Sequence, residues 1–454
     1  MKQHRLFELA ADEQPRPVEA DRGGGTPRLR TAVRDQVVMR TLALDQMLPE
    51  DDEARLVWDF VCQADLSALH ASIRAVEGVA GRNAADPRIL LALWLYATIK
   101  GVGSARELDR LCQRHLAYQW ICGDVSMNYH TLADFRVQQG ALVDRLLSEQ
   151  LAVLMRAGAV TLERVAQNGV RVRASAGSSS FRRRPSLERC LAEAQMRVEG
   201  LKAELTTDPA AENRRQKAAR ERATRERESR VSAALKAWKE VQAKKEHRGR
   251  DSLKTPARAS TTDADARKMK MADGGTRPAY NVQFATDTSS QVIVGVDVVT
   301  AGSDAGQLAP MQEQIQQRSG RQPQELLADG GFSTIEELEK LNDPGDGRKL
   351  YMPVKNEEQK REQGKDPFLP QPGDTPAVAE WRQRMGTPEA KQIYRLRAAT
   401  AECVNAQARN RGLQQFWVRG LNKVRIICLW YALAHNVLRM AALRAVGGVK
   451  AGKS

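Results

Sequence analysis

The sequence predicts an α/β fold built on a mixed five-stranded sheet, preceded by an all-α domain and split by a basic helical insertion. Five segments have the alternation or apolar composition of strands, whereas helical spacing dominates the first third of the chain. A run rich in Lys and Arg separates the first strand from the other four. We expect a flexible basic arm at 1–35, a helical domain at 36–160, the first part of the core at 161–185, the insertion at 186–254, the rest of the core at 255–440 and a basic tail at 441–454.

Composition and charge narrow the class of protein. The 454 residues are 42% apolar, enough for a large core and two or three domains. An excess of 71 Lys and Arg over 56 Asp and Glu gives a net charge of +15, which favours a polyanionic partner such as nucleic acid. A basic protein without such a partner fits the charge too. Six cysteines without a CxxC pair indicate reduced thiols rather than a zinc site.

Neither a signal peptide nor a membrane span is expected. Charges run throughout residues 1–40, which leaves no apolar core for a signal peptide. The most hydrophobic stretch, 426–443, is interrupted by His435, Asn436 and Arg439, and we expect it to be too polar and too short to cross a bilayer. These features predict a cytoplasmic protein.

The helical first domain contains a candidate DNA-reading helix. Apolar residues recur at helical spacing from about 42 to 159, with Ile89, Leu90, Leu93, Trp94 and Ala97 on one face. Ser104 and Glu107 form a capping box. The segment 129–136 is short enough to be the second helix of a helix-turn-helix, lying in the major groove. An ordinary helical bundle explains this segment equally well.

The insertion is expected to be a helical hairpin that contacts phosphates. Residues 212–250 hold 14 Lys and Arg against 6 Asp and Glu, and Asp208-Pro209 marks the bend between the two arms. A solvated helix face also explains such a run, but its arginine density favours phosphate contact. The candidate contacts at the insertion are Arg182, Arg183, Arg184, Arg214, Arg215, Arg220 and Arg222.

The strands place two polar side chains where chemistry is expected. The predicted strands are 165–174, 280–285, 291–300, 325–329 and 349–354. In the first, Asn168 shares a face with Ala166 and Val170. In the fourth, Asp329 lies at the end of the strand, at the open end of the sheet. The connections are expected to be a helix at 308–317, a Ser333-capped helix at 334–341 and a long loop at 356–387.

A helix from Thr387 to Gly412 carries a row of polar residues. Thr387-Pro388-Glu389 and Gly412 mark its ends. Tyr394, Arg397, Glu402, Asn405 and Arg409 fall within an arc of about 140° if each residue turns about 100°. A glutamate in such a row is usually a solvated salt-bridge partner, so this face alone does not indicate catalysis.

These segments together resemble a bacterial insertion-sequence transposase of the DDE type, with an InsH-like N-terminal domain and an RNase H-like catalytic core. The resemblance is carried by the segments 165–170, 280–283 and 328–332 and by the Tyr–Arg–Glu–Lys/Arg signature. In this chain the signature is Tyr394, Arg397, Glu402 and Arg409, with four residues between Arg397 and Glu402 and arginine in the place of the more usual lysine.

The resemblance implies a catalytic and metal site made of Asn168, Asp329 and Glu402, in the places of the first, second and third acidic residues. Such enzymes hold two divalent ions, Mg²⁺ or Mn²⁺, for strand cleavage and strand transfer. Arg397 and Arg409 would contact phosphates, and Tyr394 would position the DNA backbone or stack on a base. Packing of this helix on the sheet is the alternative role of all three.

Asn168 stands where an aspartate is expected. Its amide offers one oxygen but no charge, and its NH₂ is a donor, so we expect weak metal binding and an inactive chain. Two origins fit: a substitution introduced to trap a DNA complex, which the otherwise intact core favours, or a decayed or domesticated element. Five carboxylates are conceivable substitutes, but their positions predict ordinary surface roles: Asp263, Asp265, Asp287, Asp297 and Asp304.

The expected function is a DNA transposase that binds the terminal inverted repeats of its insertion sequence and target DNA, as a homodimer on double-stranded DNA in the bacterial nucleoid. A non-catalytic DNA-binding repressor and an ordinary endonuclease are the alternatives. Two apolar groups are candidate dimer surfaces, although each domain's own core explains them too: Trp94, Leu95, Ile99, Trp120 and Ile121, and Ile426, Leu429, Trp430, Leu433 and Val437.

Overall fold

The computed structural model describes residues 44–73, 83–207, 214–247, 254–342 and 347–445, together with a few isolated positions. Side chains are not described at 204–207 and 214–217. The chain divides into a unit at Met1–Ala43 and a unit at Leu44–Ser454. The expected basic arm, the bend of the insertion and most of the basic tail therefore lie outside the described residues.

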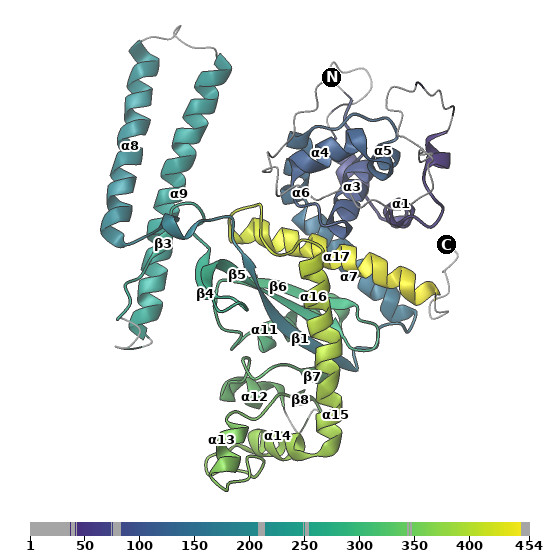
Figure 1. The fold of residues 1–454 in the computed structure, drawn as a ribbon, viewed down its shortest axis with the longest axis vertical. Coiled ribbons are helices and arrows are strands. Elements are labelled where there is room, and N and C mark those ends of the chain that lie inside the picture. The colour runs from purple at the N-terminus through teal and green to yellow at the C-terminus, as the bar shows by residue number, and fades with distance from the viewer. Residues whose placement is uncertain are drawn as a thin grey trace, which may run out of the picture. The chain divides into compact units, whose positions relative to one another are not determined.

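The predicted N-terminal domain is helical, as expected (Figure 1). Its helices are α1 (Glu53–Gln63), α2 (Ser67–Ala71), α3 (Pro87–Ile99), α4 (Ala105–Arg114), α5 (Leu116–Cys122), α6 (Tyr129–Gln138) and α7 (Gly140–Arg156). The Ser104 hydroxyl accepts a hydrogen bond from the Glu107 amide at 3.4 Å, which confirms the cap of α4. The five residues expected on one apolar face of α3 are buried, but burial extends around the helix and includes every residue of α3 except Arg88. This helix lies inside a core that surrounds it.

A mixed sheet with the expected five strands confirms the predicted fold class. They are β1 (Arg164–Arg173), β5 (Thr276–Asp287), β6 (Ile293–Val299), β7 (Glu325–Leu327) and β8 (Lys349–Tyr351). Their order is β6-β5-β1-β7-β8, with β5 antiparallel to β1 and β6 and with β1, β7 and β8 parallel. A short strand that was not predicted, β4 (Arg267–Lys270), also pairs with β5. The parallel strands β7 and β8 end at Leu327 and Tyr351, and Asp329 follows β7, whereas β1 continues to Arg173.

The helices after β6 correct two expectations. α11 (Leu308–Ser319) and α12 (Ile335–Leu341) are present, but Thr334 rather than Ser333 caps α12 by accepting from the Glu337 amide. The expected loop at 356–387 contains α13 (Glu357–Glu362) and α14 (Pro376–Gly386). Proline at the first position of α14 and burial of Val378, Trp381 and Met385 at helical spacing explain why α14 forms.

The insertion is a helical hairpin, as predicted. Its arms are α8 (Arg184–Thr207) and α9 (Arg214–His247), which pack against each other (Figure 1). At its base β2 (Phe181–Arg182) pairs with β3 (Ala259–Ser260), so both ends of the insertion are tied together. Leu187 of α8 and Ala234 of α9 are fully buried in a small core there.

The C-terminal helices complete the core. They are α15 (Pro388–Arg397), α16 (Cys403–Asn410) and α17 (Leu421–Ala445). One apolar cluster contains Trp94 of α3, Phe284 of β5 and Trp430 of α17. The candidate dimer residues on α3, α5 and α17 lie within or against this cluster, so packing within the chain explains them. Packing in the chain's own core is the alternative that the sequence left open for these residues, and it is the role seen in the structure.

In the described part of the chain, α17 is the one helix that is long and apolar enough to cross a membrane, with a mean hydropathy of 1.5 in its most apolar window. This length and hydropathy differ from the expectation of a stretch too short and polar for a span. However, 61% of that window is buried inside the protein. A core helix meets the same criteria of length and composition.

Candidate active site

Asn168 lies within β1, and Asp329 follows the neighbouring parallel strand β7 by two residues. Ala166 of β1 pairs with Leu327 of β7, and each polar residue comes two positions later. Asn168 shares its face of β1 with Val170 and Val172, which pack in one core with residues of α16. β1 also contacts the helical turn that ends at Glu402. Asn168, half-buried, therefore faces the helix that carries the third predicted site residue.

A π-helical turn, η3 (Ala398–Glu402), explains the unusual spacing of the signature. In a continuous α-helix, five residues of about 100° each would place Glu402 about 140° from Arg397. The i→i+5 hydrogen bonds of a π-turn accommodate one additional residue. Glu402 thus takes the place of a residue four positions after Arg397, and its Oε1 accepts from the Arg397 guanidinium at 2.6 Å. The π-turn therefore accommodates the extra residue, and the four residues of the signature remain on one face of the helical segment.

Deleting Ala398 should therefore be tolerated. Removal of one residue from a π-turn leaves a continuous α-helix in which the residues on either side keep their relative rotation. We expect a loss of about 1 kcal/mol or less in the free energy of unfolding, measured by circular dichroism during thermal unfolding. Deletion of Ala406, also exposed but within regular α16, should cost more, because it rotates buried Ala408 out of the core. Equal losses for the two deletions would contradict the role given to η3.

Tyr394 and Arg397 connect the carboxylates of this site. Burial raises the pKa of Tyr394, the positive charge of Arg397 opposes this rise, and the negative charges of Asp329 and Glu402 add to it. These four groups are therefore electrostatic neighbours. The Arg397 guanidinium lies 5.6 Å from the centre of the Tyr394 ring, within the range of a cation–π contact. One face of that ring is thus already occupied, which limits base stacking to the other.

The donor set fits hard divalent ions in its chemistry but lacks one negative charge. Asp329 and Glu402 offer carboxylate oxygens, and Asn168 offers an amide oxygen. The Glu402 side chain is 51% exposed, and one Asp329 oxygen accepts from the Gly331 amide at 2.7 Å. Within the described ranges, no group of three or more His, Cys, Asp and Glu side chains is arranged to hold a metal ion. An aspartate at position 168 would supply the third carboxylate.

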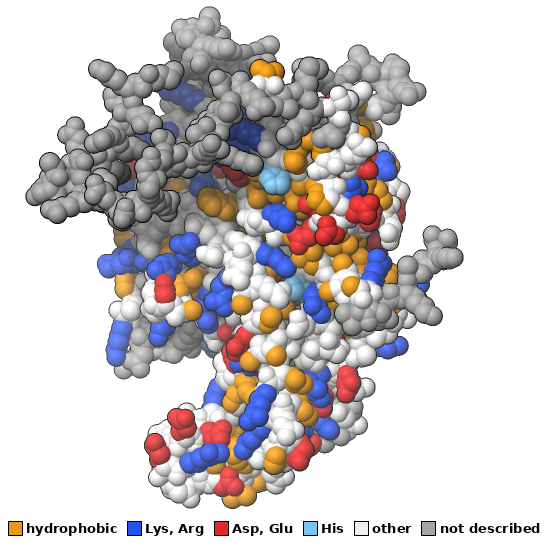
Figure 2. Space-filling view, turned by 45° about the vertical axis from the view of Figure 1, so that its right-hand side comes forward, with side chains coloured by type: hydrophobic (Ala, Val, Ile, Leu, Met, Phe, Trp, Pro, Cys, Tyr) orange, Lys and Arg blue, Asp and Glu red, His pale blue; other side chains and the backbone are white. Residues whose placement is uncertain are grey.

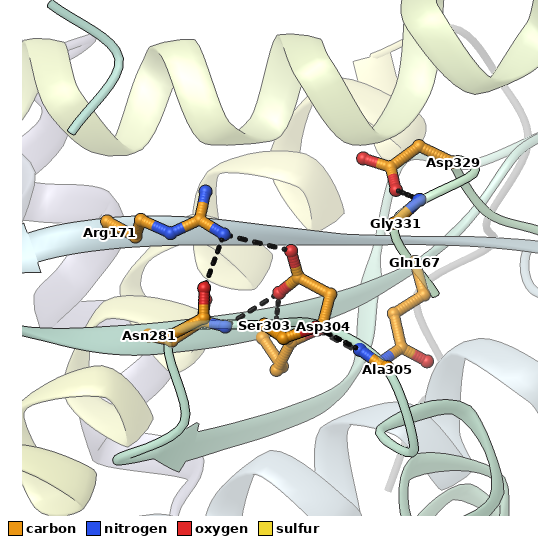
Figure 3. Close-up of polar contacts among 10 residues, drawn as sticks. Gln167, Arg171, Asn281, Ser303, Asp304, Ala305, Asp329 and Gly331 are labelled. Atoms are coloured by element: carbon orange, nitrogen blue, oxygen red, sulfur yellow. Dashed lines mark hydrogen bonds and ion pairs between the residues drawn. The ribbon is translucent and has the colours of Figure 1, made fainter. Parts of the chain in front are cut away.

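Asp304 is the centre of a buried polar cluster on the opposite face of β1, shown in Figure 3. Its Oδ1 accepts from the side-chain amides of Asn281 and Gln283, each at 2.6 Å. Its Oδ2 lies 3.4 Å from the guanidinium of Arg171. Both oxygens are therefore engaged within the protein, and the surface role expected for Asp304 is wrong.

The expected surface role is also wrong for Asp263 and Asp287. Asp263 is buried, and its Oδ1 accepts from the Tyr280 hydroxyl at 2.7 Å. Asp287 is buried at the end of β5, and its Oδ2 accepts from the Ser290 amide at 2.9 Å, which stabilises the turn into β6. Asp265 and Asp297 are half-buried. Sequence position alone could not show which of these carboxylates the tertiary fold would cover.

Sequence analysis missed the cluster around Asp304, although a signal for it was present. Gln167, Gly169 and Arg171 alternate with the residues of the Asn168 face, and Asn281 and Gln283 alternate in the same way on β5. Two neighbouring strands with polar residues on the same face predict a buried polar network. Gly169 is required there, because a Cβ at that position would lie 2.2 Å from Asp304 Oδ1.

The predicted DNA contacts fall in two separate regions. Arg397 and Arg409 are on α15 and α16, whereas the predicted contacts at the insertion are on β2, on α8 and α9, and at Arg183 between β2 and α8. Arg182, Arg183, Arg220 and Arg222 are exposed, and Arg184 pairs with Glu188 at 2.7 Å. The side chains of Arg214 and Arg215 lie outside the described residues. On the face seen in Figure 2, Lys and Arg side chains are scattered with acidic side chains between them, so net charge alone does not locate a DNA path there.

The candidate reading helix α6 presents no exposed Lys or Arg. Its one arginine, Arg136, is buried and lies 4.3 Å from the centre of the Trp94 ring. Burial lowers the pKa of Arg136 to about 10. The backbone carbonyls of Leu132 and Arg136 accept from Trp94 and Trp430, so one side of α6 is fixed in the core. These contacts favour the helical bundle over a helix free to enter a major groove.

Two family models match the chain. Residues 42–138 match a transposase domain family (DUF772), and residues 358–441 match a transposase DDE domain family. These two matches support an insertion-sequence DDE transposase. The second match contains Tyr394, Arg397, Glu402 and Arg409 of this transposase, whereas Asn168 and Asp329 lie outside both matches. Comparisons with curated proteins and with solved structures gave no significant match.

The family determines the general class of activity. Transposases act on DNA, and DDE transposases generally use divalent metal ions. The family matches do not assign roles to individual residues such as Asn168 and Asp329.

Proposed function

We propose that Asn168, Asp329 and Glu402 are the three metal-ligand positions of this transposase, and that the amide at 168 leaves the chain able to bind transposon ends but unable to cut or join them. The register of the parallel strands supports the proposal. Ala166 of β1 pairs with Leu327 of β7, and Asn168 and Asp329 each come two residues later. Glu402 ends the helical turn η3, which contacts β1.

The proposed chemistry follows from this donor set. Bound Mg²⁺ or Mn²⁺, two per site, would stabilise the attacking and leaving oxygens of an in-line displacement at phosphorus. Asp329 and Glu402 would hold the ions, and Asp329 is kept in place by the Gly331 amide. The pairing of Arg397 with Glu402 must loosen for both Glu402 oxygens to serve as ligands. The freed guanidinium would then be available for a phosphate.

The rival proposal is a DNA-binding protein without catalysis, such as a repressor derived from a transposase. Asn168 favours it. Asp329 and Glu402 argue against it, because a protein that only binds DNA does not need two carboxylates beside bound phosphates. The repulsion between such carboxylates and DNA weakens binding unless cations offset it. We therefore attribute the proposed inactivity to the single residue at position 168 in an otherwise catalytic site, rather than to a protein that only binds DNA.

We further propose double-stranded DNA as the partner, including both terminal inverted repeats and the target, with a homodimer forming on the DNA. Joining two ends requires two active sites in a fixed relation, and two-fold symmetry supplies this. Exposed arginines of the helical hairpin would contact phosphates outside the active site. This activity would take place with the nucleoid in a bacterial cytoplasm.

Binding to end DNA tests this proposal. The probes are duplexes of about 50 base pairs from each end of the insertion sequence and an internal duplex of equal length. We expect tighter binding to the ends, no strand cleavage in Mg²⁺, and a light-scattering mass of two protein chains with two ends. Equal affinity for all duplexes would contradict end recognition, and one chain per end without pairing would contradict the dimer.

A further inference from the structure

A hollow of about 660 Å³ opens along β1, and its lining includes Gly169, which follows Asn168 in the chain, and Arg409 of the signature. β7 pairs with this edge only as far as Ala166, and the next pairing there is a single bridge between Arg173 and Gln415. Between these points, none of the described residues forms a strand along this edge of β1, whereas β5 pairs with its other edge throughout. The hollow occupies this gap, and its wall begins at Gly169, the residue after Asn168.

The backbone of β1 directs hydrogen-bonding groups into the gap. The Glu163 carbonyl accepts from the Glu325 amide at 2.9 Å, and the Arg173 amide donates to the Gln414 carbonyl at 3.1 Å, both along this edge. In a strand, every second residue points its N–H and C=O to the same edge. The amides of Gly169 and Arg171 therefore point toward the hollow. Backbone N–H groups of this kind are good donors to phosphate oxygens.

Cations from four separate segments line the hollow. They are Arg171 and Arg173 of β1, Lys270 of β4, Arg277 of β5 and Arg409 of α16, against the single carboxylate of Asp273. Asp273 pairs with Arg277, and Asp304 with Arg171. Arg173, Lys270 and Arg409 are exposed. Because the cations converge from different elements on one concave surface, this is not the charged side of a single solvated helix.

We propose that this hollow binds backbone phosphates of the DNA strand that is to be cut, next to the phosphodiester at the Asn168–Asp329–Glu402 site. The inference rests on the proposed function and adds the route of the DNA. A concave wall with five cations and two inward amides matches a phosphodiester chain, which carries one charge per phosphate. Arg409, the last residue of the signature, belongs to this wall and lies one helix segment beyond Glu402.

The salt dependence of DNA binding tests the hollow, with a 30-base-pair duplex and the full chain. The double variant Arg173→Gln/Lys270→Gln removes two phosphate contacts, so the slope of log K against log salt should become shallower by about 1.8, at about 0.9 for each contact. The charge-preserving variant Arg173→Lys/Lys270→Arg should keep the slope of the unchanged chain. The matched control Arg321→Gln/Lys365→Gln removes one exposed arginine and one exposed lysine that do not line the hollow, and it should also keep that slope.

Two results distinguish the inference from the proposed function. A double glutamine variant whose slope equals that of the charge-preserving variant, with an unchanged melting temperature, would overturn the hollow as a DNA site and leave the proposed function intact. Absence of DNA binding by the unchanged chain would contradict the proposed function itself. An equal change of slope in the Arg321→Gln/Lys365→Gln control would also overturn the inference, because it would show a general effect of charge.

Discussion

The variant Asn168→Asp is expected to nick and join transposon ends in Mg²⁺ at a rate roughly 10³-fold above that of the unchanged chain. The aspartate supplies the third carboxylate beside Asp329 and Glu402, and metal-ion stabilisation of a developing charge contributes several kcal/mol, at about 1.4 kcal/mol for each factor of ten. The rate of cleavage of end duplexes, followed on denaturing gels with and without Mg²⁺, measures the effect.

Three controls sharpen this result. The variant Asn168→Ala should be as inactive as the unchanged chain, and unlike asparagine before Gly169 it cannot deamidate to aspartate during storage. Adding Glu402→Gln or Asp329→Asn to Asn168→Asp should abolish the gained activity, because each removes another carboxylate. An Asn168→Asp chain that binds its ends but stays inactive would show that position 168 is not a metal-ligand position.

Replacing Asp304 by alanine is expected to lower the free energy of unfolding by about 3–5 kcal/mol. The change leaves the buried amides of Asn281 and Gln283 without their acceptor and removes the partner of Arg171. Each unsatisfied buried donor costs about 1–3 kcal/mol. The half-buried Arg171 also loses its carboxylate partner, which adds to this cost. Urea unfolding followed by circular dichroism measures the loss.

Graded and matched variants test the cause of that loss. Asp304→Asn keeps one acceptor oxygen for Asn281 and Gln283, so its loss should be clearly smaller than that of Asp304→Ala. Glu313→Ala removes a carboxylate that pairs with Lys340 at 2.9 Å while both side chains are 61% exposed, and it should change stability by no more than about 0.5 kcal/mol. If Asp304→Ala is as mild as Glu313→Ala, the Asp304 cluster does not stabilise the sheet.

The five strands could be predicted because their own residues carry the signal. β1 and β5 alternate in polarity along most of their length, and turn residues separate β5 from β6. The position of Asp329 after a short apolar strand likewise placed it at the sheet edge. α13 and α14 could not be predicted in the same way, because proline and glycine clusters around them are also typical of loops.

Other features depend on the tertiary fold. The π-turn at η3 could not be predicted by assigning 100° to every helical residue. The sequence shows only that Arg397 and Glu402 are one residue farther apart than is usual. The burial of Asp304 appears only when β1 and β5 place their polar residues on one face. The hollow at β1 exists because β7 ends early, and strand lengths on neighbouring segments are not encoded in the pattern of β1.

The central claim is that positions 168, 329 and 402 form one metal site. A crystal structure of the Asn168→Asp variant with end DNA and Mn²⁺, using anomalous scattering to locate the metal, tests this most directly. We expect two Mn²⁺ peaks about 4 Å apart, held by the carboxylates at 168, Asp329 and Glu402 beside one phosphodiester. Mn²⁺ bound elsewhere, or at Asp329 and Glu402 without the carboxylate at 168, would contradict the claim.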